Sequence, residues 1–146
     1  MLKITDLSYR YQSRGSFTLQ KINLQLAEGE MLLLAGRSGC GKSTLIKAIS
    51  GLLGSDGTGE LQGSIYLNGE DTTYWPPERI GRLAGTVYQS PDDQLFAMTV
   101  ADEVGFALEN QGQAPETVKR QVSEALRLVG LAGFEDYSIH KLSGGP

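Results

Sequence analysis

The sequence predicts an α/β fold built around a phosphate-binding loop, and three neighbouring features lead to this prediction. Residues 36–44 read Gly-Arg-Ser-Gly-Cys-Gly-Lys-Ser-Thr, which fits Gly, four free residues, Gly-Lys and then Ser or Thr. Residues 31–35 form an apolar run without alternation, typical of a strand buried on both faces of a parallel sheet. After the loop, apolar residues recur at helical spacing: Leu45, Ile46, Ala48, Ile49, Leu52 and Leu53. This order predicts that the loop opens a helix packed against the sheet.

Each residue type in the loop has a physical role in binding a polyphosphate. The glycines allow left-handed backbone and a close approach to an anion: Gly36, Gly39 and Gly41. Successive N–H groups, those of Ser38 and Cys40 included, are expected to point inward with the positive end of the helix dipole behind them. Lys42 is expected to reach the β- and γ-phosphates, Ser43 to ligate Mg²⁺ and Thr44 to lie near the α-phosphate. The alternative, a Gly-rich turn that only caps a helix, does not need Lys followed by Ser.

The length, composition and charge of the chain exclude several classes of protein. The chain has 146 residues, 40% hydrophobic and 21% charged, which fits a globular protein with a single core. A net charge of -4 argues against a nucleic-acid partner, which usually requires a basic face. No apolar run approaches the roughly 18 residues that cross a bilayer, and residues 1–6 do not form a signal peptide, so we expect a cytosolic protein. The single cysteine, Cys40, excludes an internal disulfide; it is either a tolerated small residue or a redox sensor.

Two strands are expected before the loop. Residues 2–11 and 17–26 alternate apolar and polar side chains and are joined by a polar turn, which predicts an antiparallel pair. Tyr11, at the end of the first strand, is our candidate for stacking on a nucleotide base, with Tyr9 in reserve. The alternative is a strand tyrosine that only packs.

Two further strands are expected after the loop. Residues 61–68 read as a strand that ends at an Asn68-Gly69 turn, and Pro76-Pro77 begins a short segment of about one helical turn. Residues 83–88 form a second apolar run suited to the parallel sheet. Gln89 follows at its carboxyl end, where ligands bind in open α/β sheets, so we expect it to reach the γ-phosphate or its metal.

The remainder is predicted to be helical. Thr99 and Asp102 form a capping pair before one apolar stripe: Val100, Val104, Ala107 and Leu108. Pro115 suits the first position of a second helix, which Gly130 ends. The second stripe consists of Val118, Val122, Ala125, Leu126 and Val129. We expect both stripes to be packing faces.

The phosphate loop, the Gln89 loop and residues 142–145, Leu-Ser-Gly-Gly, occur in an order and spacing that resemble the ATPase subunits of ATP-binding cassette (ABC) transporters over the whole chain. The amino-acid sequence of residues 88–96 is most similar to that of the energy-coupling factor branch, whose members drive uptake of vitamins or of cobalt and nickel ions. The resemblance implies a P-loop NTPase core with an N-terminal antiparallel β subdomain and a helical subdomain, ending after the signature motif. Its parts would be residues 1–30, 31–93 and 94–146.

The resemblance also implies roles for single residues. Tyr11 would stack on adenine, residues 36–44 would be the Walker A loop, and Gln89 would touch Mg²⁺ and the attacking water while its loop senses a transmembrane subunit. The signature motif would contact the γ-phosphate bound to a second ATPase subunit: Ser143, Gly144 and Gly145. ATP and Mg²⁺ are the implied cofactors, and the inner face of the cell membrane is the implied location.

Two departures from the family pattern affect the expected activity. Pro146 stands where the family usually has Gln, which places a residue without an N–H at the end of the signature. The family's Walker B Asp, catalytic Glu and switch His follow the signature and are not among these 146 residues; His140 precedes it and is expected at the surface. We therefore expect the chain alone to bind nucleotide at most. A non-catalytic binding module and another phosphate-loop enzyme, such as a small-molecule kinase, are the alternatives.

Overall fold

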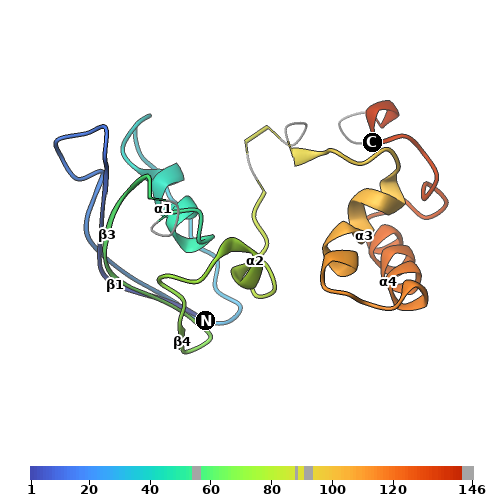
Figure 1. Cartoon of the computed structure of the whole chain (residues 1–146), viewed down its shortest axis with the longest axis horizontal. Coiled ribbons are helices and arrows are strands. Elements are labelled where there is room, and N and C mark those ends of the chain that lie inside the picture. Colours follow the sequence, from blue (N-terminus) through green and yellow to red (C-terminus); the bar gives the residue numbers. More distant parts are fainter. Residues whose placement is uncertain (54–56, 88, 91–93, 143–146) are drawn as a thin grey trace. The chain divides into compact units, whose positions relative to one another are not determined.

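The structure is a computed structural model that describes residues 1–53, 57–87, 89–90 and 94–142. The chain divides into two compact units, residues 1–86 and residues 87–146. Figure 1 shows a sheet with α1 and α2 in the first unit and the α3–α4 pair in the second.

The first unit contains an antiparallel sheet with the strand order β2-β1-β3-β4. Its strands are β1 (Leu2–Tyr11), β2 (Leu19–Leu26), β3 (Gly59–Leu67) and β4 (Glu70–Asp71). The predicted antiparallel pair is confirmed as β1 and β2, and β3 pairs with the other edge of β1. Asn68 and Gly69 have φ values of 51° and 87°, which confirms the predicted turn between β3 and β4.

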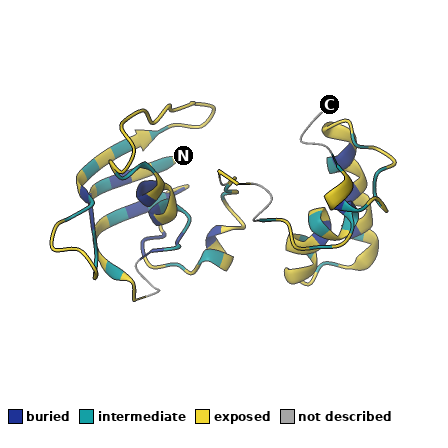
Figure 2. Ribbon diagram, turned by 90° about the horizontal axis from the view of Figure 1, so that it is seen from above, coloured by how far each residue is buried: buried dark blue, intermediate teal, exposed yellow. Residues whose placement is uncertain are grey.

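Helix α1 (Lys42–Ile49) lies on one face of this sheet (Figure 1). Leu45 and Ala48 of α1 join a single buried cluster with side chains of the strands. The other buried members are Ile4, Leu7, Tyr9, Leu19, Leu53, Leu61 and Ile65. In Figure 2, buried positions of the first unit, drawn in dark blue, lie on the strands and on α1. The helix that follows the loop therefore packs on a sheet as predicted, but the sheet is antiparallel rather than parallel.

Two predicted strands do not form. Residues 31–35 and 83–87 have no strand assignment, and Tyr88, the last residue of the second predicted strand, lies outside the described residues. Met31 is 98% exposed and Val87 86% exposed. A strand of a parallel sheet needs a neighbour for its backbone hydrogen bonds, and neither segment pairs with another part of the described chain. An apolar run in the sequence does not show whether another strand is present to pair with it.

A short helix, α2 (Pro77–Ile80), follows β4 and confirms the predicted helical turn at the two prolines. The proline ring fixes φ near its helical value at the first position of the helix, where the missing N–H has no acceptor in any case. Ile80 is the buried residue of this turn.

The second unit is built on α3 (Val100–Asn110) and α4 (Pro115–Leu128), followed by the short 3₁₀ helix η2 (Ile139–Lys141). The Asp102 N–H donates to Thr99 Oγ1 at 3.2 Å, which confirms the predicted cap. The core of this unit is made by Val100, Val118, Val122, Leu126 and Ile139. His140 is exposed, as expected.

The predicted stripe on α3 is confirmed in part, because Val100 is buried and Leu108 packs against the core of the unit. Val104 is 37% exposed and Ala107 is exposed, whereas Gly105 is buried. A Cβ at Gly105 would lie 3.2 Å from Val118 and 3.4 Å from Val122, so α4 packs directly on the glycine backbone. On α4 the predicted stripe holds at Val118, Val122 and Leu126, but the helix ends at Leu128 and Val129 is 68% exposed.

Candidate phosphate-binding site

The loop at residues 36–41 leads directly into the first turn of α1. Gly41 is the N-cap residue, with φ 101° and ψ 1°, and Gly39 has φ 79°. The two glycines therefore adopt the left-handed backbone that the sequence predicts, which other residues rarely adopt. Gly36 does not have a positive φ. A Cβ there would lie 2.8 Å from Cys40 Sγ, so the glycine allows the Cys40 side chain to lie close to the backbone at position 36.

Gly41 also lies against the start of β2. A Cβ at this position would lie 3.0 Å from Leu19 Cδ2 and 3.1 Å from the Thr18 carbonyl oxygen. Backbone conformation and lack of space thus both require glycine here. The part played by Thr18 and Leu19 in positioning the loop has no signal in the sequence, because it depends on how β2 packs.

The Lys42 ammonium folds back over the loop. Nζ donates to the Gly36 carbonyl at 2.8 Å and to the Arg37 carbonyl at 2.9 Å, and it lies 3.6 Å from Cys40 Sγ. Within the described part of the chain, the ion pairs join Arg10 to Glu60 and Arg79 to Glu70, so no carboxylate neutralises this ammonium. Its positive charge is available to an anion in the loop.

The first turn of α1 adds backbone donors. The N–H groups at the start of a helix have no intrahelical acceptor, and α1 has neither a side-chain cap nor an acidic residue in its first turn. The Cys40 N–H donates to the Arg37 carbonyl at 3.3 Å and closes the preceding turn, so it is not free for an anion, contrary to the prediction from the sequence. A helix N-terminus with free donors and an adjacent ammonium favours a phosphate. The loop therefore fits the polyphosphate of a nucleotide.

The two hydroxyls after Lys42 face different surroundings. Ser43 is exposed, so its hydroxyl could hold a metal ion that accompanies bound phosphates. Thr44 is only 8% exposed, and its Oγ1 lies 3.3 Å from the Tyr11 hydroxyl oxygen. Tyr11 is half-buried, and its ring meets that of Tyr9 edge to face at 4.8 Å. The structure thus brings Tyr11 beside the loop and also packs it.

The remaining predicted site residues belong to the second unit. Gln89 is exposed and belongs to the second unit, residues 87–146. The signature residues Ser143, Gly144 and Gly145, together with Pro146, lie outside the described residues. Their roles stay predictions.

Within the described residues, no helix has the length and apolar character needed to span a bilayer. The same residues contain no group of three or more His, Cys, Asp or Glu side chains that could hold a metal ion. At the loop, Ser43 is the predicted ligand for Mg²⁺, together with phosphate oxygens of a bound nucleotide.

Comparison with known proteins gives a consistent result. The sequence profile of the ABC transporter family matches residues 19–146. A protein of Methanosarcina mazei named as an ABC transporter ATP-binding protein is 42% identical over 145 residues, covering 99% of this chain and 25% of the relative. Similarly named proteins of Streptomyces avermitilis and Pyrococcus horikoshii are 38% and 37% identical over 99% of this chain, covering 26% and 51% of the relatives. The chain thus spans between a quarter and a half of the length of these relatives.

Proposed function

Because the chain belongs to the family of ABC transporter ATP-binding proteins, we propose that its loop at residues 36–44 binds the phosphates of ATP and that the protein drives a transporter. The observation that carries this proposal is the Lys42 ammonium, which lies over the loop on two carbonyl oxygens without a carboxylate partner among the described residues. The free N–H groups of α1 adjoin it. ABC membership also favours this function over the alternative of a small-molecule kinase.

The proposed chemistry is in-line attack of water on the γ-phosphate, in which the bond from the γ-phosphorus to the bridging oxygen breaks and ADP leaves. Charge grows on the phosphoryl oxygens in the transition state, and Lys42 with the N–H groups of the loop would stabilise it. Mg²⁺ held by Ser43 would neutralise the β- and γ-oxygens when bound. Gln89 would position the water and contact the metal. Tyr11 would hold the adenine by stacking, since it adjoins the loop through Thr44.

For the second unit we propose contact with a transmembrane subunit through the Gln89 loop and the helices. Phe96 and Phe106 form an edge-to-face pair at 4.4 Å, although they are 62% and 42% exposed, and Met98 nearby in the chain is 76% exposed. The Glu103 carboxylate accepts the N–H groups of Phe96 and Ala97 and fixes this segment at α3. Exposed aromatic groups on a fixed segment suit a protein contact.

We extend the proposal to the transport cycle. Ser143, Gly144 and Gly145 would contact the nucleotide of a second ATPase subunit at the inner face of the membrane. The transporter would be an importer of a vitamin or of a metal cation such as cobalt or nickel. This proposal rests on the resemblance of residues 88–96 to the energy-coupling factor branch.

Equilibrium titration with ATP and Mg²⁺ tests the nucleotide site. Lys42→Ala should weaken binding by roughly 10-fold to 150-fold, the range for one charge-assisted hydrogen bond of about 1.5–3 kcal/mol. Lys47→Ala is the matched control, because it removes an exposed lysine from the last turn of the same helix. Equal affinities for the two variants would contradict the proposal.

Phosphate release separates binding from hydrolysis. The 146-residue chain contains no equivalent of the catalytic Glu of the family after its signature, so we expect negligible turnover from this chain alone. Turnover at family levels that disappears in Lys42→Ala would overturn this expectation. Tight binding of ATP without turnover would agree with it and also with a non-catalytic binding module.

A further inference from the structure

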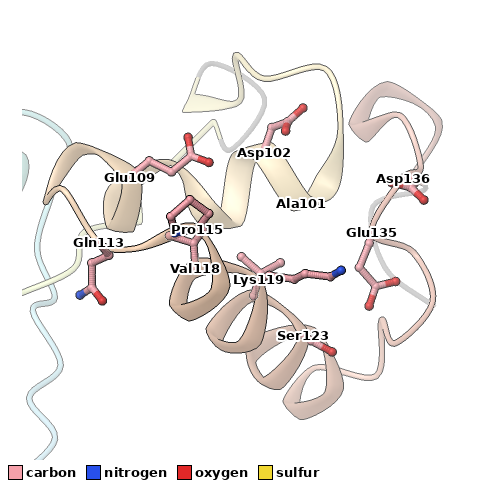
Figure 3. A pocket seen from close by; sticks show the side chains of 11 residues that line it. Ala101, Asp102, Glu109, Gln113, Pro115, Val118, Lys119, Ser123, Glu135 and Asp136 are labelled. Carbon is pink, nitrogen blue, oxygen red and sulfur yellow. The ribbon is translucent and has the colours of Figure 1, made fainter.

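The groove between α3 and α4 in the second unit does not suit a nucleotide base. Figure 3 shows this groove of about 750 Å³, with α3 along one side and α4 along the other. Its described lining residues include four carboxylates, which repel phosphates, and no aromatic side chain on which a base could stack. Binding of the base therefore depends on Tyr11 in the first unit and on the contacts that hold the Tyr11 ring.

The ring of Tyr11 is held by a second tyrosine. Tyr9 and Tyr11 are two residues apart on β1, so their side chains share one face of the sheet, and their rings meet edge to face at 4.8 Å. Tyr9 is 0% exposed and belongs to the buried cluster of the first unit, so its own ring cannot reach a base. Tyr11 is only half-buried, which leaves part of its ring accessible. Tyr9 is thus a fixed support for the ring that is proposed to stack.

The hydroxyl of Tyr9 is anchored from outside β1. Tyr9 Oη lies 2.9 Å from Thr58 Oγ1. A buried tyrosine hydroxyl needs a hydrogen-bond partner, because the loss of its hydration is costly otherwise. Gly59 leaves the space for this contact, since a Cβ there would overlap the Tyr9 hydroxyl. The hydrogen bond therefore restrains the Tyr9 ring at the end that is farthest from the backbone.

Thr58 is itself held at the end of β1. The Gln12 N–H donates to the Thr58 carbonyl at 3.1 Å, and Gln12 Nε2 donates to the Gly57 carbonyl at 2.7 Å. Gln12 is the residue that follows Tyr11 in the sequence. The contacts thus form a closed path that leads from Tyr11 through Tyr9 and Thr58 to Gln12 and back.

We propose that Thr58 is a positioning residue for the nucleotide base: through the Tyr9 hydroxyl, it holds the Tyr11 ring in the orientation that accepts the base. The inference rests on the proposed function, in which Tyr11 stacks on adenine. A ring that is already restrained loses less conformational entropy when a base stacks on it, so the base binds more strongly. Thr58 acts on the base alone, because the path does not include the loop that binds the phosphates.

The test compares ATP with inorganic tripolyphosphate, which lacks a base, in equilibrium titrations of the intact protein with Mg²⁺. Thr58→Val removes the hydroxyl and keeps the shape of the side chain. It should weaken ATP binding by about two-fold to four-fold and change tripolyphosphate binding by less than about 1.5-fold. Thr58→Ser keeps the hydroxyl and should bind ATP as the parent does.

Tyr9→Phe removes the same hydrogen bond from its other side. It should weaken ATP binding as much as Thr58→Val does, and the double variant should show no further loss, because the two changes break one interaction. Losses that add in the double variant would contradict the proposal. An unchanged ratio of the ATP and tripolyphosphate dissociation constants in both single variants would overturn it.

Thr73→Val is the control for a purely structural effect. It removes another threonine hydroxyl of the first unit, which accepts the Ile65 N–H at 2.9 Å and also bonds to Asp71. Urea denaturation should show a loss of stability for Thr73→Val, while the ratio of the two dissociation constants stays that of the parent. An equal change of this ratio in Thr73→Val and Thr58→Val would show that Thr58 only supports the fold.

Tyr11→Ala separates failure of this inference from failure of the proposed function. If the ratio is unchanged in Tyr11→Ala, the proposed stacking is wrong, and the role of Thr58 is wrong with it. If the ratio changes in Tyr11→Ala but not in Thr58→Val or Tyr9→Phe, the stacking stands and only the role of Thr58 is overturned.

Discussion

The hydroxyl oxygen of Tyr11 lies 3.3 Å from Oγ1 of Thr44, which connects the end of β1 to the first turn of α1. The aromatic ring proposed for the nucleotide base and the loop proposed for its phosphates therefore lie side by side in one unit. Substitutions of Tyr11 can therefore separate the contribution of the ring to ATP binding from that of the hydroxyl.

Tyr11→Ala should weaken ATP binding by roughly 3-fold to 10-fold, as expected for a lost stacking contact of about 0.5–1.5 kcal/mol. Tyr11→Phe keeps the ring and should bind ATP nearly as the parent does. Inorganic tripolyphosphate, which lacks a base, should bind both variants equally well in the same titration. An equal loss for tripolyphosphate in Tyr11→Ala would show that Tyr11 supports the loop and not the base.

Gly41→Ala should weaken ATP binding and lower the free energy of unfolding by about 1–2 kcal/mol or more. The added Cβ forces a residue with φ 101° against Leu19 Cδ2 and the Thr18 carbonyl. Gly29→Ala is the control, because Gly29 has φ 77° with no atom within 4 Å of the added Cβ. Urea denaturation should show a smaller loss for Gly29→Ala, with ATP binding unchanged. If Gly29→Ala were as damaging as Gly41→Ala, the contact with β2 would not matter.

Thr99→Ala should destabilise the second unit by about 1 kcal/mol, because the Asp102 N–H loses its acceptor at the start of α3. Thr99→Ser keeps the oxygen and should restore most of the loss. Thr117→Ala removes a hydroxyl from the first turn of α4, which has no side-chain cap, and should be nearly neutral. Helical circular dichroism during thermal unfolding measures all three. No difference between Ala and Ser at position 99 would count against the cap.

Acid should remove a stabilising contribution of Glu60 at the β1–β3 pair. A hydrogen bond from Gln62 and then the Arg10 guanidinium, 2.6 Å away, hold the pKa of Glu60 below its ordinary value of 4.5. A carboxyl group whose pKa is lower in the folded state stabilises the fold above its unfolded pKa, and this stability disappears as the pH falls through the folded pKa. The difference in melting temperature between the parent and Glu60→Gln should therefore shrink below about pH 4.5. An NMR titration should show that Gln62→Ala raises the pKa of Glu60; an unchanged titration would contradict the assigned cause.

Local patterns located the elements that depend on local contacts. Alternation located β1 and β2, the Asn68-Gly69 turn marked the end of β3, and Thr99 and Pro115 marked the starts of α3 and α4 where the structure has them. The spacing of residues 36–44 located the loop and its helix. These signals act over a few residues, so they do not require knowledge of the rest of the fold.

The predictions that were wrong concern features that depend on contacts between residues distant in the sequence. The apolar runs at 31–35 and 83–87 indicate burial, but a strand forms only where another strand accepts its hydrogen bonds. Gly105 has no side chain that an apolar pattern could include, yet it is buried, and a Cβ there would lie 3.2 Å from Val118 of α4. For the candidate site, the loop and the adjacent Tyr11 could be located from sequence, whereas the contact of Gly41 with Thr18 and Leu19 could not.

The position of Lys42 affects how strongly the loop can hold a ligand. Its long side chain is already restrained by the Gly36 and Arg37 carbonyl oxygens. A flexible lysine loses about 1.5–2 kcal/mol of rotamer entropy when it becomes ordered. Here that ordering accompanies folding, so an arriving phosphate meets a preorganised ammonium and less of the interaction free energy is spent at the moment of association.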